Sequence, residues 1–129
     1  EYVITIDNDV DMQTFVPAMA LHTYCDNAIR HGLVNKKGTG KLNLTIKRNG
    51  GETVIAVRDN GIGRKRSAEL GTHGNQIGLK LIQQQLEFYN TQNERKIKQE
   101  ITDLHDHEGR AAGTLVELYI PDGYRFGSN

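Results

Sequence analysis

The sequence predicts a single α+β domain, a two-layer sandwich in which a mixed β-sheet is covered by helices on one face. A chain of 129 residues is long enough for one ordinary domain and too short for two. Two segments repeat apolar residues at helical spacing, and several others alternate as half-buried strands do. Two helices can cover only one face of such a sheet, whereas a doubly wound fold would need more crossovers.

The first part of the chain predicts a strand followed by a helix. Residues 2–6 alternate weakly between apolar and polar and indicate a short strand. From Phe15 to Ile29 apolar residues recur at helical spacing, and we expect Gly32 to end this helix. Residues 33–40 are polar and rich in glycine, which predicts a loop.

A β-hairpin is predicted next. Residues 41–47 alternate strictly, with apolar residues on one face and polar residues on the other. Asn49-Gly50 is a strong signal for a tight turn, and residues 53–57 return as the second strand. The order of these elements implies that the two strands are neighbours in the sheet.

The last part of the chain predicts a loop, a helix and a second pair of strands. Residues 64–75 lack apolar periodicity and indicate a loop, and the stripe beginning at Leu79 predicts a helix over about 76–90. Residues 96–104 and 115–120 indicate two more strands.

Composition excludes several classes of function. Sixteen Lys and Arg residues balance sixteen Asp and Glu residues, which argues against a dedicated binder of nucleic acid or of anionic membranes. The single cysteine, Cys25, allows no internal disulfide and fits a reducing compartment. No signal peptide or long apolar run is present. The chain begins without Met, and we expect it to be part of a longer protein.

The predicted first helix carries a group of polar residues, Asp26-Asn27-Ala28-Ile29-Arg30-His31-Gly32. Asn27, Arg30 and His31 are spaced i, i+3 and i+4, and therefore share one face of a helix. An amide oxygen is a competent Mg²⁺ ligand, and Arg or His can meet phosphate oxygens. Taken alone, the same pattern also describes a solvated polar face.

Three further segments combine glycine with polar residues. Asp59-Asn60-Gly61-Ile62-Gly63 follows a predicted strand, where a carboxylate can accept from an exocyclic amine and glycines allow close approach of a flat ligand. Gly74-Asn75-Gln76-Ile77-Gly78-Leu79 opens the second helix, whose free N–H groups favour an anion. Gly113-Thr114 opens the last strand.

In order and spacing, these segments resemble the N, G1 and G2 boxes of the GHKL superfamily. They are most similar to the ATP-binding domain of LytS-type sensor histidine kinases, in which a proline-containing helix leads to Asn-Ala-Ile, a basic residue and His-Gly. Here Val16-Pro17-Ala18-Met19 leads into that motif, and a closing Gly-Thr-x-Val-x-Leu-x-Ile-Pro runs from Gly113 to Pro121. The resemblance covers about Thr14 to Pro121.

The resemblance implies a role for each matching residue. Asn27 would ligate Mg²⁺ on the ATP phosphates, and Asp59 would accept from the adenine amino group with support from Thr114. Asp26 occupies the acidic position that can act as a catalytic base in ATP-hydrolysing branches. The remaining implied ATP-binding residues are Arg30, His31, Gly61, Gly63, Gly74, Gly78 and Leu79, and residues 64–75 would form the ATP lid.

The resemblance also implies a reaction and its partners. The domain would transfer the γ-phosphoryl group of Mg-ATP to a histidine on a dimerisation helix absent from this chain, and would be inactive alone. The whole protein would be a membrane-anchored homodimer with this domain in the cytoplasm, and a response regulator would be its downstream partner.

Three alternatives stay open. Within the superfamily, the domain could be a serine kinase that acts as an anti-sigma factor. Gln76, which replaces a usual glycine, and the short lid are also consistent with a catalytically inactive nucleotide-binding module. A generic α+β binding domain, in which the glycine clusters are only turns, is the third.

Overall fold

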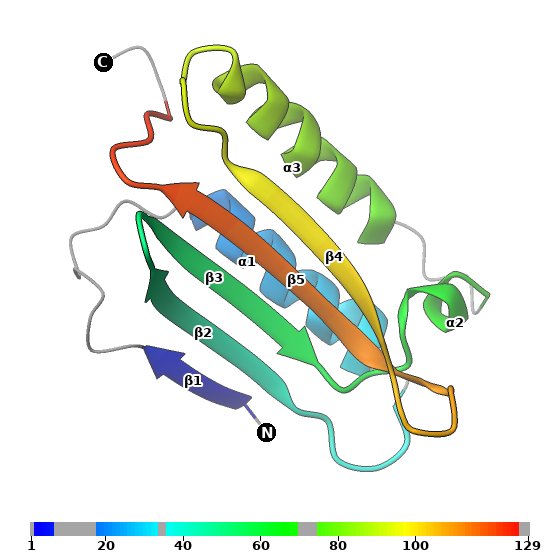
Figure 1. Ribbon diagram of the computed structural model, residues 1–129. Coiled ribbons are helices and arrows are strands. Elements are labelled where there is room, and N and C mark those ends of the chain that lie inside the picture. Colours follow the sequence, from blue (N-terminus) through cyan, green and yellow to red (C-terminus); the bar gives the residue numbers. More distant parts are fainter. Residues whose placement is uncertain (1, 7–17, 34–35, 70–74, 127–129) are drawn as a thin grey trace.

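A five-stranded sheet forms the centre of the computed structural model, which describes residues 2–6, 18–33, 36–69 and 75–126 (Figure 1). Its order is β1-β2-β3-β5-β4; β1 pairs with β2 in parallel, and the other neighbours are antiparallel. The strands are β1 (Tyr2–Ile6), β2 (Leu42–Asn49), β3 (Glu52–Asp59), β4 (Lys98–His105) and β5 (Ala111–Pro121). The helices are α1 (Ala18–Asn27), the π-helical η1 (Ala28–Leu33), α2 (Arg64–Glu69) and α3 (Asn75–Asn90). The predicted mixed sheet is confirmed.

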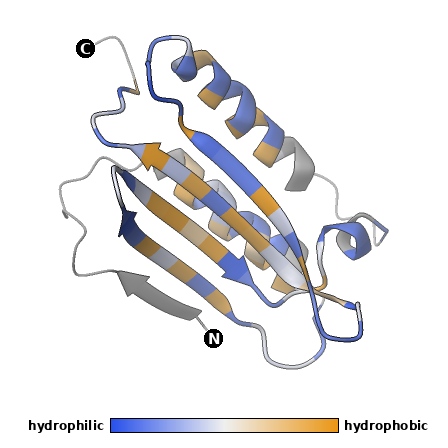
Figure 2. Cartoon of the chain, in the orientation of Figure 1, coloured by the Kyte–Doolittle hydropathy of each residue, from blue (hydrophilic) through white to orange (hydrophobic). Residues whose placement is uncertain are grey.

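Helices cover one face of this sheet, and the face toward the viewer in Figure 1 has no described helix in front of it. Along β3, the buried residues alternate with partly exposed ones, as expected for a strand covered on one side. The hydrophobic residues concentrate on the central strands, while the edge strand β4 is mostly hydrophilic (Figure 2). The predicted two-layer α+β sandwich is therefore confirmed.

The core lies between the helices and the covered face of the sheet. The apolar stripe of α3 buries Leu79, Ile82 and Leu86, as its spacing predicts. Each such side chain contributes about 1.5–3 kcal/mol when fully buried. The other buried hydrophobic residues are Ala20, Tyr24, Ala28, Leu42, Ile55, Val57, Ile97, Val116, Leu118 and Ile120. None of the described helices is long and apolar enough to cross a membrane.

Two predictions of local structure are wrong. Gly32 does not end the first helix, because the chain continues as η1 to Leu33, whose side chain packs against the core. Residues 64–69 form the helix α2 rather than a loop. A helix this short and exposed needs no apolar stripe, and helix-forming side chains with an Arg66–Glu69 ion pair support it. The predicted start of the first helix and residues 70–74 lie outside the described residues.

The start of β5 presses directly against the end of β3. Gly113 has φ of +128°, and a Cβ atom built there would lie 1.9 Å from the carbonyl oxygen of Asp59. No side chain fits in that space, so the contact requires glycine. The position of Asp59 therefore depends on a glycine that is distant in the sequence.

Gly113→Ala should lower the free energy of unfolding by about 3 kcal/mol or more, because an unfavourable backbone conformation adds to a steric clash. Gly109→Ala is the matched control, since Gly109 has φ of +80° but no atom within 4 Å of the added Cβ. It should cost about 1 kcal/mol. Urea denaturation measures both, and equal losses would contradict the contact.

Candidate functional site

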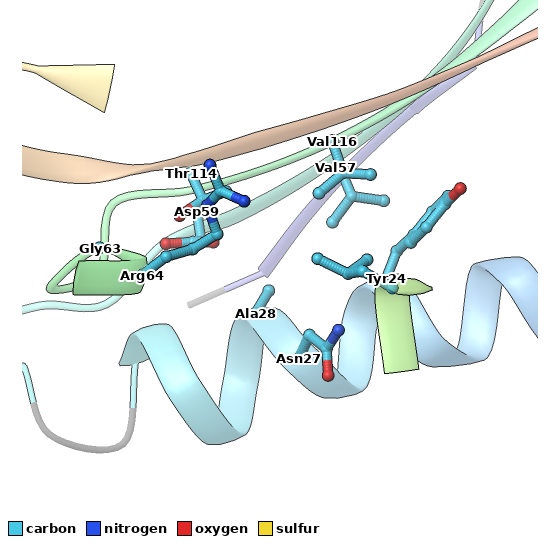
Figure 3. Close-up of a pocket in the computed structure, with 10 residues that line it drawn as sticks. Tyr24, Asn27, Ala28, Val57, Asp59, Gly63, Arg64, Thr114 and Val116 are labelled. Carbon is cyan, nitrogen blue, oxygen red and sulfur yellow. The ribbon is translucent and has the colours of Figure 1, made fainter. Parts of the chain in front are cut away.

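A pocket opens between α1 and the covered face of the sheet, closed on a further side by α3. Its cavity volume is about 30 Å³, below the usual range for small-molecule sites, so a ligand larger than a few water molecules needs the walls to move apart. Figure 3 shows Asp59, Thr114 and Arg64 at one end of the pocket, with Val57, Val116 and Tyr24 toward the other. The lining residues are Tyr24, Asn27, Ala28, Val57, Asp59, Gly63, Arg64, Leu79, Thr114 and Val116.

The polar end of the pocket is built on Asp59, the last residue of β3. Its residue surface is only 5% exposed, and its Oδ1 accepts a hydrogen bond of 2.8 Å from the N–H of Gly61. Burial raises the pKa of this carboxyl, and the N–H groups of Gly61 and Thr114 oppose the shift. Two donors leave part of the carboxylate's acceptor capacity unused. Asp59 can therefore accept from a ligand N–H.

The chain after Asp59 is held in a tight bend. The Asn60 side chain accepts from the N–H of Lys41 at 2.7 Å and donates to the carbonyl of Thr39 at 3.2 Å. Gly63 has φ of +85°, a conformation that favours glycine, and it lines the pocket. The bend thus brings backbone rather than side chain to the ligand space, as the sequence predicts for the glycines of this segment.

A hydrogen-bonded chain sets the distance between the helices at the other end of the pocket. The buried Tyr24 hydroxyl donates to Oε1 of Gln99 at 2.5 Å, and Nε2 of Gln99 donates to the carbonyl of Leu79 at 3.2 Å. These bonds join α1, β4 and α3. At the neighbouring residues, a Cβ at Gly78 would lie 3.2 Å from Thr23, so the helices touch there.

Sequence reasoning missed Tyr24 and Gln99. The apolar residues predicted to form the stripe of the first helix were Phe15, Met19, Leu21, Cys25, Ala28 and Ile29. Of these, Ala28 is buried and Leu21, Cys25 and Ile29 are only partly buried, whereas Tyr24, which was not in the stripe, is 1% exposed. Tyrosine scores poorly as a core residue because of its hydroxyl, and here the hydroxyl is satisfied by Gln99. The sequence did contain a signal for the burial of Tyr24, because Tyr24 and Ala28 are spaced i, i+4 and therefore share one face of the helix.

Five of the eleven predicted site residues line this pocket. Asn27, Asp59, Gly63, Leu79 and Thr114 all line it, although they lie on four different elements and one bend. Two further glycines adjoin it. Gly61 bonds the Asp59 carboxylate, and a Cβ on Gly78 would approach the Asn27 amide to 3.7 Å.

The other predicted residues lie elsewhere or outside the described part. Asp26 and Arg30 form an ion pair of 3.0 Å with side chains 39% and 71% exposed, and neither lines the pocket. The side chain of His31 and all of Gly74 lie outside the described residues. Arg64, the first residue of the predicted ATP lid, also lines the pocket.

The residues of the pocket fit a nucleotide better than a protein-bound metal. Within the described residues, no group of three or more His, Cys, Asp and Glu side chains could hold a metal ion. Asn27 offers one amide oxygen, which suits Mg²⁺ only if phosphate oxygens and water supply the other ligands, as is common for this ion. A flat base with an N–H edge suits the apolar walls and the buried Asp59 acceptor.

Comparisons with known proteins place the fold. No protein-family model matches the chain. It is 34% identical over 94 residues to an uncharacterized Bacillus subtilis (strain 168) protein, YwpD, a match covering 69% of this chain and 33% of the relative. The chain thus spans about a third of the length of that curated relative.

Two solved structures resemble the domain over 94% of its length. The histidine kinase domain of a blue-light activated histidine kinase from Erythrobacter litoralis EL346 superposes with a TM-score of 0.63 at 19% identity, covering 51% of that chain. The nucleotide-free catalytic domain of histidine kinase ThkA gives 0.59 at 16% identity, covering 77% of that chain. The fold is that of histidine kinase catalytic domains.

The raised pKa of Asp59 predicts a pH dependence of stability. A raised carboxyl pKa means that ionisation opposes folding, so the parent loses stability as pH rises from about 4, the ordinary carboxyl value, to the raised pKa. The unfolding free energy of Asp59→Asn minus that of the parent should therefore increase over this window and be constant above it. Denaturant titrations at several pH values measure it.

Asp103→Asn is the control of opposite sign. The hydrogen bond from Arg64 lowers the pKa of Asp103, so ionisation of this carboxyl favours folding. The free energy of unfolding of Asp103→Asn minus that of the parent should therefore fall as pH rises from the lowered pKa to about 4. A difference for Asp59→Asn that falls with pH would contradict the assigned shift.

Proposed function

We propose that this chain is the ATP-binding catalytic domain of a sensor histidine kinase of LytS type. The observation that carries the proposal is one largely apolar pocket whose lining includes both Asp59 and Asn27. The fold, shared with histidine kinase catalytic domains, supports it. The reaction proposed is transfer of the γ-phosphoryl group of ATP to a histidine outside this chain.

In this proposal, each lining residue has a distinct task. Asp59 accepts from the adenine amino group, and Thr114, its partner across the β3–β5 ladder, supports the base from the sheet side. Val57, Val116 and Leu79 exclude water from the ring. Asn27 holds the metal end of the nucleotide. Mg²⁺, when bound with the nucleotide, would neutralise phosphate charge, which is the main need of phosphoryl transfer.

The whole protein would supply what this domain lacks. We propose that the acceptor histidine lies on a dimerisation helix outside the chain, that the protein is a membrane-anchored homodimer with this domain in the cytoplasm, and that it passes the phosphoryl group to a response regulator. The balanced charge of the chain supports a role without nucleic acid.

A nucleotide-binding module without phosphoryl transfer is the second candidate. It is favoured by the pairing of Asp26 with Arg30 at the surface, outside the pocket lining. The two candidates differ in one measurement. The full-length protein incubated with γ-labelled Mg-ATP should form phosphohistidine if it is a kinase, whereas bound nucleotide without phosphohistidine would favour the module.

Asp59→Asn should weaken the binding of ADP about 10- to 100-fold, because a charged acceptor of the base is replaced by an amide. Isothermal calorimetry on the chain measures the affinity. Asp122→Asn, at the opposite end of the sheet, is the control and should leave it unchanged. Equal ADP affinity in the Asp59 variant and the parent would reject the adenine assignment.

Asn27→Ala should reduce nucleotide affinity more in the presence of Mg²⁺ than in its absence, because the amide is proposed to act through the metal. A loss of about tenfold is expected with Mg²⁺. Asn43→Ala, an exposed amide on β2, is the control. If the loss is the same in both conditions, Asn27 has no metal role.

A further inference from the structure

Arg64 links the pocket to the edge of the sheet. It is the first residue of α2 and lines the pocket beside Gly63. Its Nε and Nη2 atoms donate to the two carboxylate oxygens of Asp103 on β4 at 2.8 and 2.9 Å. The Arg64 side chain is 29% exposed and that of Asp103 48%. A bidentate pair of this kind fixes the plane of the guanidinium.

The sheet register puts this pair in line with the proposed base acceptor. Asp59 pairs with Thr114 across β3 and β5, and Thr114 pairs with Asp103 across β5 and β4. Directly paired residues share a face, so all three stand in one row on the helix side, with about 5 Å between strands. Figure 3 shows Arg64 at the Asp59–Thr114 end of the pocket.

The ion pair with Asp103 also determines which atoms of the Arg64 guanidinium can contact a ligand. The Asp103 carboxylate neutralises the guanidinium charge and would repel phosphate oxygens, so the pair is a poor anchor for a triphosphate. The flat face of the guanidinium and its Nη1 edge are not used by Asp103. A guanidinium is weakly hydrated and stacks well on aromatic rings.

We propose that Arg64 contacts the purine base, not the phosphates, and that Asp103 is the positioning residue that orients it. The inference rests on the proposed function, because it assumes that the base lies against Asp59. It adds a specificity-determining side chain at the base end of the pocket. The Arg64 guanidinium forms the wall of the base site on the side facing α2.

The test compares adenosine, ADP and ATP, each with Mg²⁺, by calorimetry. Arg64→Ala should weaken all three by the same factor of about five, the value expected for loss of one cation–π contact. Arg64→Lys should not restore affinity, since it keeps the charge and loses the planar fork. Asp103→Asn should lower the affinity for each of the three ligands about twofold. Added to Arg64→Ala, it should lower the affinities no further.

The Arg48–Asp122 pair provides matched controls. It is also a bidentate pair of similar exposure, at the other end of the sheet. Arg48→Ala and Asp122→Asn should leave the three affinities unchanged. Thermal melts show whether each variant folds. If Arg64→Ala does not fold, the inference is tested by the affinities of Asp103→Asn, which removes the charge with little change in size.

The outcomes separate the inference from the proposed function. A loss that grows from adenosine to ATP assigns Arg64 to the phosphates and overturns the inference, and so does an unchanged affinity in a folded Arg64→Ala variant. An Arg64→Lys variant that binds all three ligands with the affinity of the parent also overturns the inference, because lysine lacks a planar group. If the parent binds none of the three ligands, the proposed function itself fails, whatever the variants do.

Discussion

The burial of the Asp59 carboxylate is the constraint on which the rest of the site depends. A desolvated carboxylate is costly unless N–H groups surround it, and the backbone of Gly61 and Thr114 supplies them only if the bend after β3 and the start of β5 are both in place. The compensation is incomplete, since burial still raises the pKa of Asp59. A residual cost of this kind is typical of groups kept for binding rather than for stability.

Close contacts at two glycines determine the shape of the pocket around Asp59. Gly113 lets β5 lie against the carbonyl of Asp59, and Gly78 lets α3 approach α1 beside Thr23. The Tyr24–Gln99–Leu79 chain of hydrogen bonds also joins these helices to β4. Because the walls are held by contacts between several elements, the spacing of the pocket is a property of the whole fold and not of one motif.

The sequence predicted the parts of this arrangement that have a local pattern. The hairpin and the α3 stripe follow from alternation and helical spacing, whereas the proximity of Asn27 to Asp59 was implied only by the resemblance to the GHKL motifs. The bonds of Arg64 with Asp103 and of Tyr24 with Gln99 could not be predicted, because their partners are 39 and 75 residues apart and leave no periodic signal. The helix α2 was missed since it is too short and exposed to show a stripe.

The placement of Asp26 bears on the acceptor. It is bonded to Arg30 at the surface and does not line the pocket. A hydroxyl or a water molecule must lose its proton as it attacks phosphorus, so it needs a base within hydrogen-bond reach. A neutral imidazole attacks with a nitrogen lone pair and needs no base, and phosphoryl transfer then depends on positioning and charge neutralisation alone. Because Asp26 is paired with Arg30 and lies outside the pocket lining, it does not supply such a base in this structure.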